Sequence, residues 1–309
     1  MRQTIEQSIP SQAEVGGVSI REMDTFTHRL EKLPDHMKEA LGPEEREMLR
    51  QVNEKDPITF EHSLAVARIV DTEWPAFSND LKREGISYKD MARAAALHDV
   101  GKVALPDCIL KSTLEDQQLA DIFFQFVREQ PDLATEIMRQ KGRLSEKRTI
   151  DDVSRDALER MDHRDVLPLN FLYRNDPGAM AEIVQCGLDP HQTFMDALRT
   201  HEHKSRDFIS RSSLSDREVV AALAGSHHNY NADAEVKYPR GSEMLTLSVT
   251  ASELLHLSDV FQAMTGHRLY QKPLTESQAL EEILQMADQG LFHKEVANRW
   301  VAEYKKRLS

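Results

Sequence analysis

The chain of 309 residues carries 39 Lys and Arg against 52 Asp and Glu, a formal net charge of −13. This acidic balance argues against sequence-independent binding to DNA or RNA, which depends on basic residues that neutralise phosphates. Two cysteines are too few for a disulfide framework, and no stretch approaches the ~20 apolar residues of a membrane span. Because the N-terminus also lacks the pattern of a signal peptide, we expect a cytoplasmic protein without a membrane segment.

Helical periodicity dominates the chain after a tail of about 20 residues. A first helical run stops at Gly42-Pro43, where a second helix begins. The other predicted helices cover residues 60–74, 88–98, 194–209, 216–227, 245–264 and 275–287, with a charged loop over 229–242. Residues 112–187 also follow a helical pattern, broken by prolines and glycines. No alternating pattern indicates a strand, so the predicted fold is all-α.

Histidines and aspartates stand at the ends of apolar helices and inside one apolar run. His98-Asp99 closes one predicted helix, His227-His228 closes another, and Asp259 lies within an apolar stretch. A carboxylate in such surroundings is costly to bury unless it is paired or bound to a metal. Each of these residues alone also fits a capping or core role. Together they favour a metal site, because imidazole and carboxylate are ligands that divalent transition metals select.

Three ordered segments resemble the HD-GYP family, the bacterial cyclic di-GMP phosphodiesterases of the HD superfamily. They are residues 94–110 (AAALHDVGKVALPDCIL), His227-His228 followed by Tyr238-Pro239-Arg240-Gly241, and residues 258–272 (SDVFQAMTGHRLYQK). Together with His62, the resemblance covers about residues 55–110 and 190–300. It implies an HD-type helical bundle over residues 55–309, preceded by a tail and accessory helices over 1–54, with residues 112–187 as a helical insertion.

The resemblance also implies a binuclear metal site, with Asp99 as the bridge between two divalent transition-metal ions. The implied ligands are His62, His98, Asp99, Asp259, His201, His227 and His228. These ligand types suit Fe, Mn, Zn or Ni about equally, so the metal stays open. Asp99 and Lys102 are the expected catalytic residues. Phosphate or guanine contacts are expected from Lys102, Arg240, Arg268 and Lys272, whereas Tyr238 either stacks on a base or packs in the core.

Two histidines compete for the ligand position that follows the insertion. His201 shares a helical face with Phe194, Ala197 and Leu198, whereas His203 falls on the polar side of the same helix. A ligand must face the core of the bundle. We therefore predict His201 as the ligand and His203 as a solvated residue.

Several positions depart from the family pattern. Lys237 stands where the glycine of the Gly-Tyr-Pro segment is usual, Asn229 replaces a usual Glu, and Gln262 replaces a usual Asp. Ile58 lies one turn before His62, where some members have a Glu ligand to a third metal, so two metals are expected. The insertion over residues 112–187 is a candidate lid, dimer surface or binding surface for a signalling partner.

This pattern is compatible with three functions. The first is hydrolysis of cyclic di-GMP, or of a related cyclic dinucleotide, to a linear dinucleotide or to GMP. The second is phosphohydrolysis of another nucleotide by an HD enzyme, which has no need of His227-His228 or of the Tyr-Pro-Arg-Gly segment. The third is a catalytically weak or inactive protein that binds a dinucleotide or a partner in signalling. The sequence favours the first.

Overall fold

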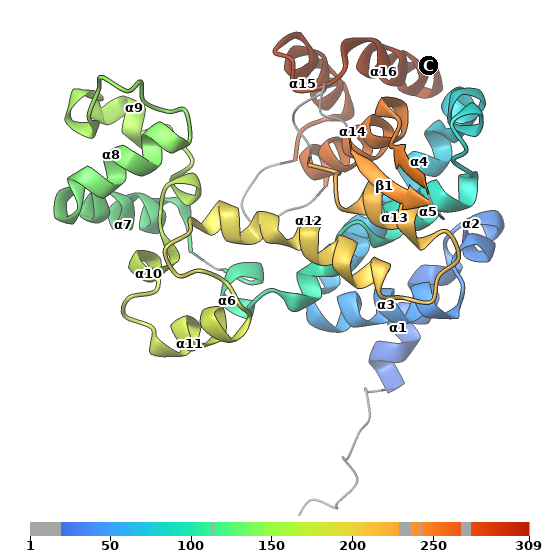
Figure 1. Ribbon diagram of the computed structural model, residues 1–309, viewed down its shortest axis with the longest axis horizontal. Coiled ribbons are helices and arrows are strands. Elements are labelled where there is room, and N and C mark those ends of the chain that lie inside the picture. Colours follow the sequence, from blue (N-terminus) through green and yellow to red (C-terminus); the bar gives the residue numbers. More distant parts are fainter. Residues whose placement is uncertain (1–19, 113, 229–235, 241–242, 267–272, 309) are drawn as a thin grey trace, which may run out of the picture.

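The computed structural model describes residues 20–112, 114–228, 236–240, 243–266 and 273–308 (Figure 1). Over these described residues the structure is 71% helical, with 16 α-helices and one small two-stranded sheet. The predicted all-α class is confirmed. Within the described ranges, no helix is both long enough and apolar enough to cross a membrane.

The elements follow one another along the chain as helices of very different lengths. The α-helices are α1 (Ile20–Glu31), α2 (Asp35–Ala40), α3 (Pro43–Lys55), α4 (Pro57–Arg83), α5 (Tyr88–Leu97), α6 (Asp107–Leu110), α7 (Asp116–Glu129), α8 (Pro131–Gln140), α9 (Arg155–Glu159), α10 (Leu169–Leu172), α11 (Pro177–Gln185), α12 (Phe194–Ser210), α13 (Arg217–Ala224), α14 (Val249–Thr265), α15 (Glu276–Asp288) and α16 (Lys294–Leu308). Three 3-10 helices are η1 (Val100–Ala104), η2 (Ile150–Asp152) and η3 (His163–Asp165), and the strands are β1 (Lys237–Arg240) and β2 (Glu243–Thr246).

The main core is built around α4, whose start is fixed by local chemistry. Asp56 caps this helix by accepting a hydrogen bond from the Ile58 N–H at 3.0 Å, and Pro57 occupies its first turn. One face of α4 then buries large side chains such as Phe60, Leu64 and Phe77 against α5, α14 and α16. These contacts fix the rotation of α4 and therefore the direction of His62, which lies on the same buried face.

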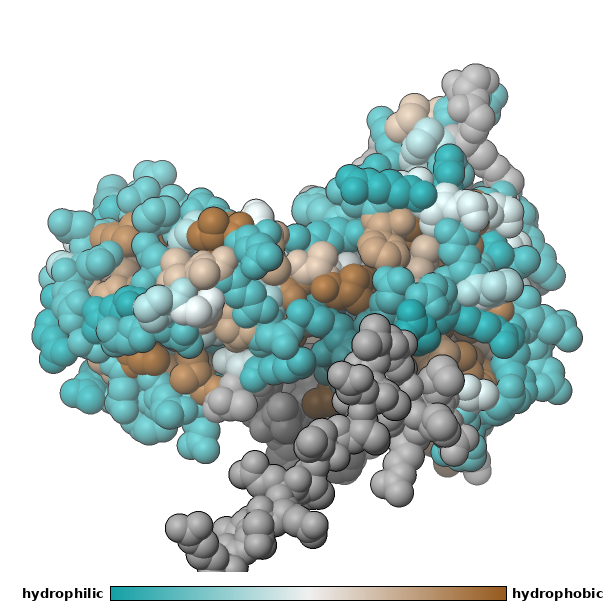
Figure 2. All heavy atoms as spheres, turned by 90° about the horizontal axis from the view of Figure 1, so that it is seen from below, coloured by the Kyte–Doolittle hydropathy of each residue, from teal (hydrophilic) through white to brown (hydrophobic). Residues whose placement is uncertain are grey.

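Residues of the predicted insertion have a hydrophobic core of their own. Phe123, Phe126, Ile137, Ile150 and Leu167 are among the buried side chains of this second core, which lies entirely between residues 114 and 172. Figure 1 shows α7 to α11 as a separate lobe beside the main one. A third, smaller core joins the two lobes through α6, α11 and the first half of α12. In Figure 2, hydrophilic residues cover most of both lobes on the face seen from below.

The structure differs from the predicted elements at three places. The first helical run is interrupted at Pro34, which has no N–H to donate, so α1 and α2 are separate helices. The helix predicted to end at residue 74 continues through Pro75 to Arg83. Part of the predicted loop and the start of the predicted helix 245–264 instead form the antiparallel pair β1–β2, with Tyr238 opposite Leu245. Strands of four residues are too short to show an alternating pattern.

A buried carboxyl joins α14 to the start of α16. Glu253 on α14 is 4% exposed, and the His293 backbone N–H donates a hydrogen bond to it. Its Oε2 atom is buried without a hydrogen-bond partner among the described residues. Burial raises the pKa of Glu253 from 4.5 to about 7. Between about pH 4.5 and pH 7, Glu253 therefore keeps its proton in the folded chain and loses it in the unfolded chain.

We predict that Glu253→Gln stabilises the protein only at neutral and alkaline pH. With its folded-state pKa raised, ionised Glu253 destabilises the native state increasingly as pH rises from about 4.5 to about 7. Glutamine is never ionised, so the variant gains up to about 3 kcal/mol in free energy of unfolding above pH 7 and almost nothing near pH 4.5. Urea unfolding at several pH values measures this difference, with exposed Glu282→Gln as the matched control. A gain that does not change with pH would contradict the assignment.

Candidate metal centre

The site begins where α5 ends. α5 starts with a capping box between Ser87 and Asp90, and its buried residues pack it against α4 and α13. His98 follows as its C-cap, and Asp99 connects it to η1. Both side chains are almost completely buried, with Asp99 1% exposed. The end of one apolar helix therefore places an imidazole and a carboxylate inside the main lobe.

One oxygen of Asp99 faces the first group of ligands. Asp99 Oδ2 lies 3.4 Å from His98 Nε2 and 3.6 Å from His62 Nε2. Asp259 of α14 closes this group, with its Oδ1 at 2.8 Å from His62 Nε2 and 3.8 Å from His98 Nε2. Three helices therefore bring His62, His98 and Asp259 within the distances that one metal ion requires.

The other oxygen of Asp99 faces the second group. Asp99 Oδ1 lies 3.1 Å from His201 Nε2 and 3.9 Å from His227 Nε2. His228 lies beside them, with its ring centroid 5.3 Å from that of His201 and 4.1 Å from that of His227. His201, His227 and His228 form a second set of potential ligands for one ion. Asp99 is thus the carboxylate between two groups of histidines.

Four histidines of the site are oriented by a hydrogen bond from Nδ1, the ring nitrogen that does not face Asp99. Nδ1 donates to the backbone carbonyl three residues earlier in His98 (to Ala95 at 2.8 Å), in His201 (to Leu198 at 2.6 Å) and in His227 (to Ala224 at 2.6 Å). His62 Nδ1 donates to the side-chain oxygen of Gln262. A carbonyl can only accept, so Nδ1 carries the proton and Nε2 points into the site. Such partners fix the tautomer of metal-binding histidines.

Burial determines the charge of the histidines in the second group. It lowers the pKa of His227 well below the usual range and that of His228 to about 3. Both rings are therefore neutral near pH 7, and a neutral ring that carries its proton on Nδ1 offers a lone pair at Nε2, as His227 does. His201 Nε2 lies 3.2 Å from His227 Nε2, close enough for both to be ligands of one ion.

The carboxylates of the site are ionised although they are buried. Burial by itself raises the pKa of Asp99, but Lys102 and the surrounding histidines hold it well below its usual range. Burial likewise acts against ionisation of Asp259, and His62 and His98 reverse the effect. Burial lowers the pKa of His98, yet Asp99 and Asp259 raise it overall. Two buried negative charges require positive charge nearby, and divalent ions would supply it. The donor set therefore fits the predicted metals.

Lys102 lies beside Asp99. In η1 its ammonium donates a hydrogen bond to Asp99 Oδ2 at 2.7 Å, and its side chain is 19% exposed. Among the predicted ligands, His228 has the most exposed side chain, at 22%, while the others are at 10% or less. Lys102 and His228 are therefore the residues of the site that solvent reaches most easily.

The described residues predicted to contact the substrate lie in different surroundings. Tyr238 is 2% exposed and packs in the main core, which matches the packing alternative and leaves no free ring face for a base. Arg240 is the last residue of β1. Arg268 and Lys272 lie outside the described residues. Lys237, at the position of the usual glycine, is an exposed residue of β1.

His201 and His203 lie on the faces of α12 that the sequence pattern predicted. His201 is buried and points at Asp99, whereas His203 is exposed on the same helix. Glu202, between them, has no role in the sequence pattern, yet burial raises the pKa of its carboxyl, partly offset by His201 and His203. Gln262 is the second residue whose position at the site the sequence did not indicate, because it stands only as a departure from the family pattern.

The chain was compared with known proteins. No protein-family model matches it, and no curated protein matches it at a significant level.

A close approach between η1 and α12 holds the two ligand groups together. The Gly101 N–H donates to Ser205 Oγ at 2.8 Å. A Cβ atom at residue 101 would lie 2.1 Å from the His201 carbonyl oxygen and 2.4 Å from the Ser205 backbone nitrogen. Only glycine permits this contact, because backbone atoms rather than a flexible side chain occupy the space.

We predict that Gly101→Ala lowers the free energy of unfolding by about 2 to 3 kcal/mol, because the added methyl group pushes α12 away from η1. The same shift moves His201 from Asp99, so bound metal per chain should fall. Thermal unfolding and metal analysis measure the two effects. Gly178→Ala on α11, where the nearest atom is a side-chain oxygen at 3.3 Å, is the control and should lower neither. Wild-type stability in Gly101→Ala would refute the close approach.

Proposed function

We propose that this protein is a metal-dependent phosphodiesterase that hydrolyses cyclic di-GMP or a related cyclic dinucleotide. The observation that carries the proposal is the position of Asp99. Its Oδ2 faces His62 and His98 at 3.4–3.6 Å, while its Oδ1 faces His201 and His227 at 3.1–3.9 Å. This arrangement is the one expected of a carboxylate that bridges two divalent ions.

Two bound ions would supply a hydroxide nucleophile at neutral pH and would stabilise both the attacking and the leaving oxygen of a phosphodiester. In this assignment His62, His98, Asp99 and Asp259 hold one ion. His201, His227 and His228 hold the second, again with Asp99. Neutral imidazoles and carboxylates suit Fe, Mn, Zn and Ni alike, so the proposal leaves the metal open.

The residues around these ligands have roles that follow from their positions. Lys102 places an ammonium group at 2.7 Å from Asp99, in a part of the site that solvent reaches, and would pair with a phosphate oxygen of the substrate. The deep burial of His98, Asp99 and His227 keeps bulk water away from these three ligands. Electrostatic interactions are stronger in such surroundings than in water.

The cyclic dinucleotide is proposed from the resemblance of the segments around Tyr238 and Arg268 to the family pattern. β1, which ends at Arg240, contacts α13, the helix that precedes His227-His228. Burial of Tyr238 removes one expected contact to a base. Arginine and lysine contacts to the phosphates are therefore the proposed basis of substrate recognition.

We predict that purified protein contains tightly bound transition metal and hydrolyses a cyclic dinucleotide. His201→Ala and Asp99→Ala should each lose metal and at least about 100-fold in kcat, since each removes a group that the transition state requires. His203→Ala, two residues along the same helix, is the matched control and should keep both. Elemental analysis and chromatography of nucleotide products provide the measurements.

The possible outcomes separate the proposed functions. Metal bound by wild type and lost in His201→Ala, with no turnover of any cyclic dinucleotide, would leave a binding protein and reject the phosphodiesterase. Hydrolysis of nucleotides other than cyclic dinucleotides would indicate another HD phosphohydrolase. Equal metal content in His201→Ala and His203→Ala would reject the ligand assignment itself.

A further inference from the structure

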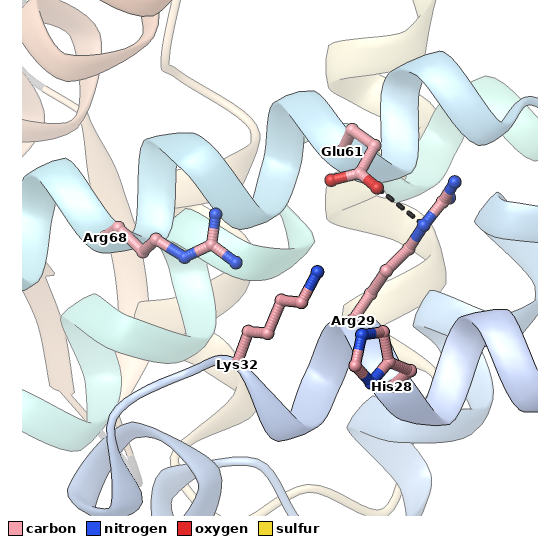
Figure 3. A pocket seen from close by; sticks show the side chains of 5 residues that line it. All are labelled: His28, Arg29, Lys32, Glu61 and Arg68. Atoms are coloured by element: carbon pink, nitrogen blue, oxygen red, sulfur yellow. Dashed lines mark ion pairs between the residues drawn. The ribbon is translucent and has the colours of Figure 1, made fainter.

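A pocket of about 400 Å³ lies between α1 and α4, away from the ligands of the candidate metal centre (Figure 3). Its lining consists of polar side chains only: His28, Arg29, Lys32, Glu61 and Arg68. Figure 3 shows Lys32 and Arg68 extending from the two helices toward the same space. We propose that this pocket binds the phosphate groups of pyrophosphate or of a nucleotide.

The charge around the pocket is opposite to that of the chain. Arg29, Lys32 and Arg68 face a single carboxylate, Glu61, in a protein whose net charge is −13. Glu61 is paired with Arg29, the Nε and Oε1 atoms being 2.6 Å apart. Positive charge therefore remains in the pocket after the one internal ion pair is counted.

The described carboxylates near the pocket pair with other groups. Asp35 and Glu31 are paired with Lys38, at 2.8 and 3.6 Å. Asp71, one turn beyond Arg68 on α4, contacts His36 at 2.6 Å and accepts a hydrogen bond from Tyr88 at 2.7 Å. Across the described part of the chain, no ion pair involves Lys32 or Arg68. Two cations that face one pocket and form no ion pair among the described residues are well placed to bind an external anion.

Phosphate is the anion that this chemistry fits best. Arginine offers a planar set of donors that match phosphate oxygens, and lysine adds a compact charge. The volume falls in the range of roughly 300–1,000 Å³ that small-molecule sites occupy. The lining includes no phenylalanine, tyrosine or tryptophan on which a base could stack. Recognition should therefore depend on the phosphates, with little contribution from the nucleoside.

The pocket and the candidate metal centre share α4 but lie on different sides of it. Glu61 is exposed and faces the pocket, whereas His62, the next residue, is buried and faces Asp259. Successive residues of an α-helix point about 100° apart, which accounts for this division. Ligand in the pocket would thus contact α4 without contacting the metal ligands, so the proposal does not rest on the proposed phosphodiesterase activity.

Isothermal titration of the full-length protein with pyrophosphate and GDP tests the proposal. Both should bind with similar dissociation constants, which rise with ionic strength, because exposed charges are screened by salt. Guanosine should not bind. Lys32→Gln combined with Arg68→Gln should raise the dissociation constant at least tenfold, while Arg83→Gln, also on α4, is the control and should leave it unchanged. Glu61→Gln removes the single carboxylate and should lower the dissociation constant, a gain that misfolding cannot produce.

The same titration in Asp99→Ala distinguishes this pocket from the metal centre. Pyrophosphate binding that persists in Asp99→Ala and weakens in the Lys32/Arg68 variant supports the proposal, whatever the result for phosphodiesterase activity. Binding that disappears in Asp99→Ala would assign the phosphate to the metal centre. Absence of binding to wild type, equal binding by guanosine, or no gain in Glu61→Gln would each overturn the proposal.

Discussion

The buried carboxylates of Asp99 and Asp259 are the constraint on which the main lobe depends. Both are ionised inside the protein, where an isolated negative charge would be very costly. Lys102 of η1 pairs with Asp99, and three histidines from α4, the end of α5 and α12 (His62, His98 and His201) lie against the two carboxylates. The packing of these helices therefore determines whether the two buried carboxylates can stay ionised.

Helix ends and backbone hydrogen bonds position the histidines around these carboxylates. His98 and His227 follow the last turns of α5 and α13, where backbone carbonyls lack intrahelical partners. Their Nδ1 atoms donate hydrogen bonds to carbonyls in those turns. Each hydrogen bond therefore gives a helix-end carbonyl its partner and also orients the imidazole ring. His201 uses the same three-residue step inside α12. The orientation of the ligands thus comes from local backbone structure and needs few dedicated residues around them.

Much of this arrangement could be predicted from the sequence. Apolar periodicity located most helices, and the polar-face argument correctly put His201 inside and His203 outside. The sequence could not show what depends on packing between distant elements. The approach of Gly101 to His201 and Ser205, the burial of Tyr238 and the role of Gln262 all arise from such contacts. The four-residue strands β1 and β2 were missed because they are shorter than any recognisable period.

α12 connects the insertion lobe with the main lobe. Its first half, with Phe194 and Ala197, packs in the core shared with the insertion, and its last turn, with Ile209, packs in the main core. His201 lies between these regions, where α12 approaches Gly101. A helix of 17 residues is about 25 Å long, so α12 joins the two cores over that distance. A displacement of the insertion lobe along α12 would consequently shift His201 relative to Asp99 and change the geometry of the second ligand group from a distance.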